Sequence, residues 1–209
     1  MTRMYCSGSL NKADLACLRE ALQDERAIVI PTDTVYGVAA TPYSTKAVNN
    51  LLCLKGRGRH MPPPVLVPSI EQAQAVCAQV DNRARALMTR LWPGALTLIL
   101  KANTDTHFDL GDKTDTIAIR MPDHPVALEI LRNTGPLAVT SANLTGQPPA
   151  TTCQQAIAYF GEGVAHYVDS GDTPGPVPST IVDISGAEVS ILRKGAIGSA
   201  TIEEILAMN

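Results

Sequence analysis

Three cations and a histidine gather in one short segment of the chain, LKGRGRH at residues 54–60. Gly56 and Gly58 interrupt the cations, and glycines let neighbouring backbone amides approach an anion closely. Each charge-assisted hydrogen bond to such an anion contributes roughly 1.5–3 kcal/mol, so the cluster suits a polyphosphate. The alternative is a solvated basic loop, in which Lys55 only offsets the dipole of a preceding helix.

A second polar segment, VTSANLTG at residues 139–146, directly follows an apolar run. Hydroxyls and an amide at the end of a strand can hold a phosphate or a ribose, because open α/β sheets bind ligands there. Ser141 lacks the setting of a nucleophile, since the chain has no GxSxG motif and no histidine visibly paired with it. The alternative is an ordinary turn around Asn143.

Arg120 ends the apolar run TIAI and precedes Met-Pro, so its guanidinium should emerge among loops. A carboxylate is the natural bidentate partner of a half-buried guanidinium. The sequence leaves open whether that carboxylate belongs to a ligand or to one of the protein's 20 acidic residues. Hydroxyls in PTDTVYG (31–37) and PSTIVD (178–183) also flank extended runs, where they serve either a ligand or the turn itself.

The elements that must position these side chains alternate along the chain. Helical periodicity and caps predict six helices, at about 11–24, 44–56, 69–80, 82–92, 125–133 and 152–160. Extended runs lie at 27–30, 35–40, 65–67, 96–101, 116–121, 136–140, 166–168, 179–184 and 189–193. These patterns predict one α/β domain with a twisted mixed sheet of about seven strands and helices on its faces.

Two connections refine this expected topology. The short turn SGAE joins the runs 179–184 and 189–193, so part of the sheet should be antiparallel rather than a pure parallel arrangement. The Pro-rich segment TPGPVP (173–178) has only six residues, which favours an active-site loop over a domain boundary.

Composition sets limits on the function. The chain has 209 residues, 17 Lys and Arg, 20 Asp and Glu, and a net charge of -3, so any anion site must be local. Five cysteines without a CxxC pair indicate reduced thiols and a cytoplasmic protein, and we expect no membrane segment. The sequence has no HExxH or spaced Cys/His set for a metal, and no Walker or GxGxxG loop for a nucleotide.

Five segments in fixed order, PTDTVYG, KGR, RMP, SAN and PSTIVD, resemble the YrdC-like threonylcarbamoyl-AMP synthase family. The resemblance covers residues 10–206, which we expect to form one synthase domain. YciO-type proteins look less similar, because the PTDTVYG and SAN segments are intact here. The resemblance implies a YrdC-like fold, with a concave, positively lined cavity in the α/β sheet, and no additional C-terminal domain as in longer members.

The resemblance also implies a reaction. Family members are nucleotidyltransferases that make threonylcarbamoyl-AMP and pyrophosphate from L-threonine, bicarbonate and ATP, with Mg²⁺ as cofactor. A downstream threonylcarbamoyl transferase then passes the threonylcarbamoyl group to an adenosine of tRNA. Contact between this chain and tRNA is therefore expected to be indirect.

Site residues follow from the resemblance by motif position. Six residues fall at ATP-binding positions: Lys55, Arg57, Thr116, Ser141, Asn143 and Arg193. Three fall at threonine-binding positions: Thr34, Arg120 and Ser179. Lys55 and Arg57, which would contact the phosphates, are the expected catalytic pair, and Arg120 is the expected clamp for the threonine carboxylate. No residue of the sequence stands out as a general base.

The phosphate loop departs from the family pattern KxRP, which continues with Lys or Asn before Pro-Leu. Gly58 stands in place of the proline, Met61 in place of the Lys or Asn, and Pro63 in place of the leucine. Because Met61 cannot bind phosphate, Arg59 or His60 is the candidate substitute.

Two other functions compete with the synthase. A non-catalytic RNA- or ribosome-binding module would use the same concave basic face, but the net charge of -3 counts against it. An ATP-dependent enzyme acting on another amino or hydroxy acid would use the same residues. Thr34 and Ser179, placed to meet a substrate hydroxyl, favour threonine.

Overall fold

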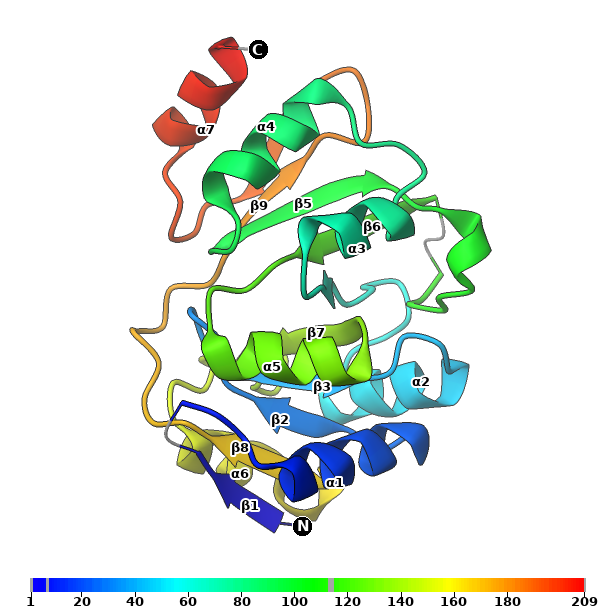
Figure 1. Cartoon of the computed structure of the whole chain (residues 1–209), viewed down its shortest axis with the longest axis vertical. Helices are drawn as coiled ribbons and strands as arrows, with labels where there is room; N and C mark the ends of the chain where they lie inside the picture. The colour runs from blue at the N-terminus through cyan, green and yellow to red at the C-terminus, as the bar shows by residue number, and fades with distance from the viewer. Residues whose placement is uncertain (1, 7, 113–114, 209) are drawn as a thin grey trace.

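The computed structural model describes residues 2–6, 8–112 and 115–208. In these residues one mixed sheet runs in the order β1-β8-β2-β3-β7-β4-β6-β5-β9-β10 (Figure 1). Its strands are β1 (Thr2–Tyr5), β2 (Ile28–Ile30), β3 (Gly37–Ala40), β4 (Val65–Leu66), β5 (Leu96–Lys101), β6 (Thr116–Arg120), β7 (Leu137–Ser141), β8 (His166–Asp169), β9 (Thr180–Asp183) and β10 (Ser190–Arg193). The predicted fold class is confirmed, with ten described strands where about seven were expected.

Seven α-helices of the described residues connect and cover these strands: α1 (Lys12–Gln23), α2 (Thr45–Leu54), α3 (Ile70–Val76), α4 (Asn82–Leu91), α5 (Pro125–Thr134), α6 (Cys153–Phe160) and α7 (Ser199–Ala207). Two short 3₁₀ turns, η1 (Thr104–Thr106) and η2 (Gly161–Gly163), complete the elements. Within the described ranges, none of the helices combines the length and apolar character that crossing a membrane requires.

Helix caps lie where the sequence predicted them. The side chain of Asn11 accepts a hydrogen bond from the backbone N–H of Asp14 at 2.9 Å, which satisfies a free donor at the start of α1. Ser44 caps α2 in the same way through the N–H of Ala47 at 3.2 Å. These local hydrogen bonds fix where each helix begins, and so fix which helix face meets the sheet.

Two elements differ from the sequence-based expectation. The helix expected at 69–80 ends at Val76, because Cys77 is extended and forms an isolated β-bridge with Ala102. Strand β1 was not expected, and it pairs in parallel with β8 from near the other end of the chain. The predicted antiparallel pairing within the sheet is confirmed, since β9 and β10 run antiparallel.

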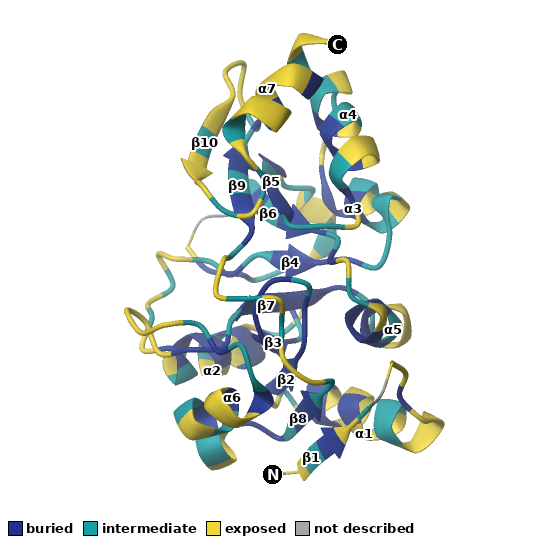
Figure 2. Ribbon diagram, turned by 90° about the vertical axis from the view of Figure 1, so that its left-hand side faces the viewer, coloured by how far each residue is buried: buried dark blue, intermediate teal, exposed yellow. Residues whose placement is uncertain are grey.

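The sheet has a covered half, formed by β1, β8, β2, β3 and β7, with helices on both faces (Figure 2). Alternate strand residues face opposite sides. Ile28 and Ile30 pack with residues of α1 and α5. Val29 and Val38 pack with residues of α2 and α6 on the other face. Because both faces of β2 and β3 are buried, these two strands are apolar throughout.

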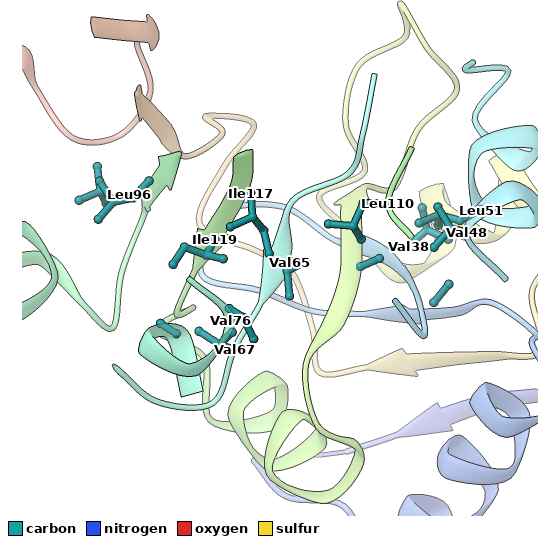
Figure 3. Close-up of a cluster of buried hydrophobic side chains, with 14 of the residues drawn as sticks. Val38, Val48, Leu51, Val65, Val67, Val76, Leu96, Leu110, Ile117 and Ile119 are labelled. Atoms are coloured by element: carbon teal, nitrogen blue, oxygen red, sulfur yellow. The ribbon is translucent and has the colours of Figure 1, made fainter. Parts of the chain in front are cut away.

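The open half is formed by β4, β6, β5, β9 and β10. Strands β5 and β6 of this half alternate between buried apolar residues on one face and cavity-lining residues on the other. Leu96 and Leu98 of β5 and Ile119 of β6 are fully buried in the core shared with α3, α4 and α7 (Figure 3). The alternate residues Thr97 and Arg120 line a cavity instead. One face of this half is therefore free to carry polar and charged side chains.

Candidate active site

The cavity has a volume of about 460 Å³ and collects side chains from both halves of the sheet. Three arginines line it, Arg57, Arg120 and Arg193, together with His60. Hydroxyls line it as well: Thr32, Thr34, Thr97, Thr116, Thr140, Ser141 and Ser179. Among the described residues that line it there is no carboxylate, so the cavity is built for an anion of limited size.

The segment Lys55-Gly56-Arg57 ends helix α2 in a Schellman motif. The N–H of Arg57 donates to the carbonyl of Leu52 at 2.9 Å, and the N–H of Gly56 donates to the carbonyl of Cys53 at 3.0 Å. Gly56 has a φ of +63°, a left-handed conformation that glycine adopts without strain. The helix stop that the sequence predicted therefore reverses the chain at the point where Arg57 must enter the cavity.

Lys55 is buried behind the cavity wall rather than in it, with a relative exposure of 1%. Its Nζ donates to the carbonyl of Ser141 and to Oδ1 of Asn143, the latter at 3.1 Å. Its own carbonyl accepts two hydrogen bonds from Thr145. Lys55 thus ties the end of α2 to the loop after β7. Burial, with the neighbouring Arg57 charge, lowers the pKa of Lys55 to about 7.

Arg57 is half-buried and under-satisfied. Its Nη1 is 3.5 Å from Oγ1 of Thr140, and its buried Nε has no hydrogen-bond partner among the described residues. Burial lowers the pKa of this guanidinium from its ordinary value. A buried donor without a partner costs about 1–3 kcal/mol, so this guanidinium is held in place at the expense of stability.

Arg120 is held by three protein groups at once. Its Nε donates to the carbonyl of Gly94 at 2.9 Å, its Nη1 to Oγ1 of Thr34 at 3.0 Å, and its Nη2 to Oδ1 of Asp33 at 2.6 Å. The guanidinium therefore has the protein carboxylate that the sequence left as an alternative. Since a guanidinium carries five N–H groups, two remain for a ligand in the cavity.

Ser179 and Arg193 form the opposite wall. Arg193 donates from Nε to the carbonyl of Ser179 and from Nη2 to its Oγ, both at 3.0 Å. The Ser179 hydroxyl also lies 2.8 Å from Oγ1 of Thr97. Gly195 makes this approach possible, because a Cβ there would lie 2.3 Å from the carbonyl oxygen of Pro178, the last residue of the predicted active-site loop.

Most of the predicted site residues come together in this cavity. Seven line it: Thr34, Arg57, Thr116, Arg120, Ser141, Ser179 and Arg193. Lys55 and Asn143 contact each other directly behind Ser141 instead. Sequence reasoning missed Thr97 and Thr140, although a threonine in each apolar run was a detectable signal. It also did not assign Asp33 to Arg120, because a pairing across 87 positions has no local signature.

The two candidates for the extra phosphate contact lie on opposite sides of their loop. His60 lines the cavity, whereas Arg59 does not. Arg59 forms ion pairs with Asp109 and Asp112 and donates to Asn49 of α2 at 2.7 Å. In this structure His60 is thus placed to reach a ligand in the cavity, and Arg59 is not.

A resident metal would need ligands that the described part of the chain does not cluster. In those residues, no group of three or more His, Cys, Asp or Glu side chains lies close enough to hold a metal ion. The described cavity lining has no carboxylate, and its neutral hydroxyls could supply single ligands to Mg²⁺ without the charge that a protein-held site needs. These residues therefore do not fit a metal held by the protein alone.

Comparison with known proteins identifies the family and the fold. Residues 20–195 match the Sua5/YciO/YrdC family model, which is described as "Telomere recombination". A Mycobacterium tuberculosis protein provisionally named threonylcarbamoyl-AMP synthase is 42% identical over 90% of this chain and 87% of its own length. The threonylcarbamoyl-AMP synthase of Bacillus subtilis is 36% identical over 95% of this chain, which spans 58% of that relative.

Solved structures show the same fold. The H234A/Y235A variant of P. abyssi Sua5 superposes with a TM-score of 0.91 at 28% identity, over 99% of this chain and 64% of that one. P. abyssi Sua5 complexed with L-threonine gives a TM-score of 0.88 at 26% identity, over 98% of this chain and 60% of that one. E. coli YciO, at 22% identity and a TM-score of 0.85 over 95% of this chain and 98% of its own, shares the fold.

The chain belongs to the Sua5/YciO/YrdC family. Within that family its relatives over about nine-tenths of the chain are threonylcarbamoyl-AMP synthases, and the chain has this nucleotidyltransferase function in tRNA modification. The resemblance that the five sequence segments indicated is thereby confirmed.

Proposed function

We propose that the cavity binds L-threonine, bicarbonate and ATP together and joins them into threonylcarbamoyl-AMP with release of pyrophosphate. The observation that carries this proposal is a cavity with three arginines and seven hydroxyls but no carboxylate among its described lining residues. Such a site neutralises a polyanion and offers hydrogen bonds to a small polar substrate. The catalytic unit would comprise residues 10–206.

We assign the ATP phosphates to Arg57 and Arg193, and the rest of the nucleotide to Thr116 and Ser141. The place of the Arg57 side chain in the cavity lining supports its phosphate role. Lys55 and Asn143 act with this group by holding the carbonyl of Ser141 and the end of α2 in place.

We assign threonine to Thr34, Arg120 and Ser179. The structure of P. abyssi Sua5 complexed with L-threonine supports threonine as a ligand of this fold. The two N–H groups of Arg120 that face no protein partner suit a carboxylate, while Asp33 holds the guanidinium in orientation. The hydroxyls of Thr34 and Ser179 can then meet the substrate's own hydroxyl.

The chemistry requires positioning and charge neutralisation rather than a covalent nucleophile. The threonine amine attacks bicarbonate, forms a carbamate and releases water. A carbamate oxygen then attacks the α-phosphorus, and the bond to the β-phosphate breaks to release pyrophosphate. Arg57 and Arg193 stabilise the charge that develops on the departing pyrophosphate, and Arg120 holds the carbamate in line.

Mg²⁺ would arrive with ATP, because it binds substrate phosphates and keeps several waters of its own. Its contribution is to offset phosphate charge, and no step above depends on a protein-held metal. The adenylate product would pass to a downstream transferase in the cytoplasm. Any contact with tRNA would then be indirect.

Pyrophosphate release from ATP tests the proposal. We expect release only when L-threonine and bicarbonate are both present, and loss of release in Arg57→Ala. Release without threonine would point to another ATP-dependent activity, and no release with all three substrates would refute the synthase. RNA affinity that falls steeply with salt and ignores ATP would instead identify the binding module.

A further inference from the structure

The loop that follows α2 points two neighbouring side chains in opposite directions. Arg59 is anchored outward by its ion pairs with Asp109 and Asp112. Its carbonyl also accepts a hydrogen bond from the N–H of Asp112 at 3.1 Å. With Arg59 fixed outward, His60 is directed to the cavity, where its ring forms part of the wall.

Gly58 makes room for this ring. A Cβ at Gly58 would lie 2.7 Å from Nδ1 and 2.8 Å from Cε1 of His60, closer than real contacts allow. The backbone of Gly58 does not have the left-handed φ that would itself require glycine. An alanine there would therefore be tolerated by the main chain and would act mainly by displacing the His60 ring.

The His60 ring has no hydrogen-bond partner within residues 2–6, 8–112 and 115–208. It is exposed, and it shares the cavity with Arg57, three positions earlier on the same loop. A side chain that is directed into an anion-binding cavity with a free ring N–H can donate to a phosphate oxygen.

We propose that His60 is a further polyphosphate-binding residue, which donates a ring N–H to the ATP phosphates beside Arg57. The inference rests on the proposed function, because it takes ATP as the occupant of the cavity. Met61, the next residue, has no group that could make this contact. Gly58 and His60 would thus form a functional pair, in which the absence of a side chain at one position allows the ligand contact at the other.

Steady-state kinetics of pyrophosphate release test the contact. We expect His60→Ala to raise the KM for ATP about tenfold, the equivalent of about one hydrogen bond to a charged oxygen, with the KM for threonine unchanged. His60→Lys, which restores a donor, should recover most of the loss. Tripolyphosphate, used as a competitor of ATP, should bind His60→Ala more weakly, whereas unchanged competition would refute a phosphate contact.

A double-mutant cycle tests the role of Gly58. Gly58→Ala should reproduce the defect of His60→Ala, and the double variant should be no worse than His60→Ala, because the ring is already absent. Gly186→Ala, at a glycine whose added Cβ meets nothing, should leave the KM for ATP unchanged. Effects of Gly58→Ala and His60→Ala that multiply would contradict the pair.

Two failures are distinguishable. A wild-type protein without threonine- and bicarbonate-dependent release would refute the proposed function. An active wild-type protein whose KM for ATP is unchanged in His60→Ala would refute the inference alone.

Discussion

The covered and open halves of the sheet use the same strand alternation for different purposes. In the covered half, both faces of β2 and β3 are buried, and no residue of either strand is charged. In the open half, β5 and β6 bury Leu98 and Ile119 on one face while Thr97 and Arg120 face the cavity on the other. Charged side chains can therefore converge at the cavity because no helix of the described residues covers this face of the sheet.

The covered half contributes mainly to stability, whereas the cavity contributes mainly to function. Apolar burial in the covered half stabilises the fold by roughly 25 cal/mol per Å² of surface removed from water. The cavity instead holds desolvated cations, such as Arg57, that oppose folding until a ligand neutralises them. Substitutions in the covered half should thus lower stability and leave substrate binding unchanged, whereas substitutions of cavity residues should impair binding or activity. The following predictions are ordered by their expected effect on the free energy of unfolding.

One of the two largest losses of stability is expected in the covered half. Leu18 of α1 is fully buried in the core against β2. Leu18→Ala should lower the free energy of unfolding by about 3 kcal/mol, the order found for buried leucines. Urea denaturation measures this change, and the KM values of the folded fraction should stay at their wild-type values. Leu144→Ala, at a leucine with 41% exposure, is the control that should change little.

The ion pair between Arg120 and Asp33 should contribute both to stability and to threonine binding. Arg120→Met leaves Asp33 without its partner and should lower the free energy of unfolding by about 3 kcal/mol, because the pair is largely buried. Adding Asp33→Asn should restore much of the stability, since no unpaired charge remains. Threonine binding, followed by calorimetry, should stay lost in both variants. Recovery of binding in the double variant would contradict the carboxylate assignment of Arg120.

Lys55 should make the free energy of unfolding depend on pH. Its pKa is about 7 in the folded chain against an ordinary value of 10.5, so between these values the unfolded chain binds a proton that the folded chain does not. The free energy of unfolding should therefore rise as pH increases from about 7 to about 10.5, through this group. Lys55→Met should lack that rise. The test is the difference between wild type and variant across the pH range, and a constant difference would contradict it.

The smallest change in stability is expected at Arg57. Removing a half-buried cation with an unpartnered donor should leave the free energy of unfolding unchanged or raise it by up to about 1 kcal/mol. Pyrophosphate release should nevertheless fall about a hundredfold, as when one donor to a developing charge is removed. A destabilised but active Arg57→Ala would reverse the comparison between the two halves.

Local sequence signals predicted many of the helix bounds and several of the site residues. Caps such as Ser44 and the Gly56 stop predicted helix bounds, because they depend on hydrogen bonds within a few residues. Polar residues at strand ends predicted most of the polar side chains that line the cavity, since strand ends meet at one edge. The directions of Lys55 and Arg59 were not predictable, because both depend on partners from distant segments. Strand β1 was not predictable for the same reason, because its partner β8 is distant in the sequence.

The central claim is that the cavity joins three substrates, and isotope labelling tests it most directly. The protein would be incubated with ATP, L-threonine and ¹³C-bicarbonate, and the nucleotides would be analysed by mass spectrometry. We predict an adenylate that contains both threonine and the labelled carbon, formed by wild type and strongly reduced in Arg57→Ala. Pyrophosphate release without such an adenylate, or an adenylate that lacks the label, would contradict the account.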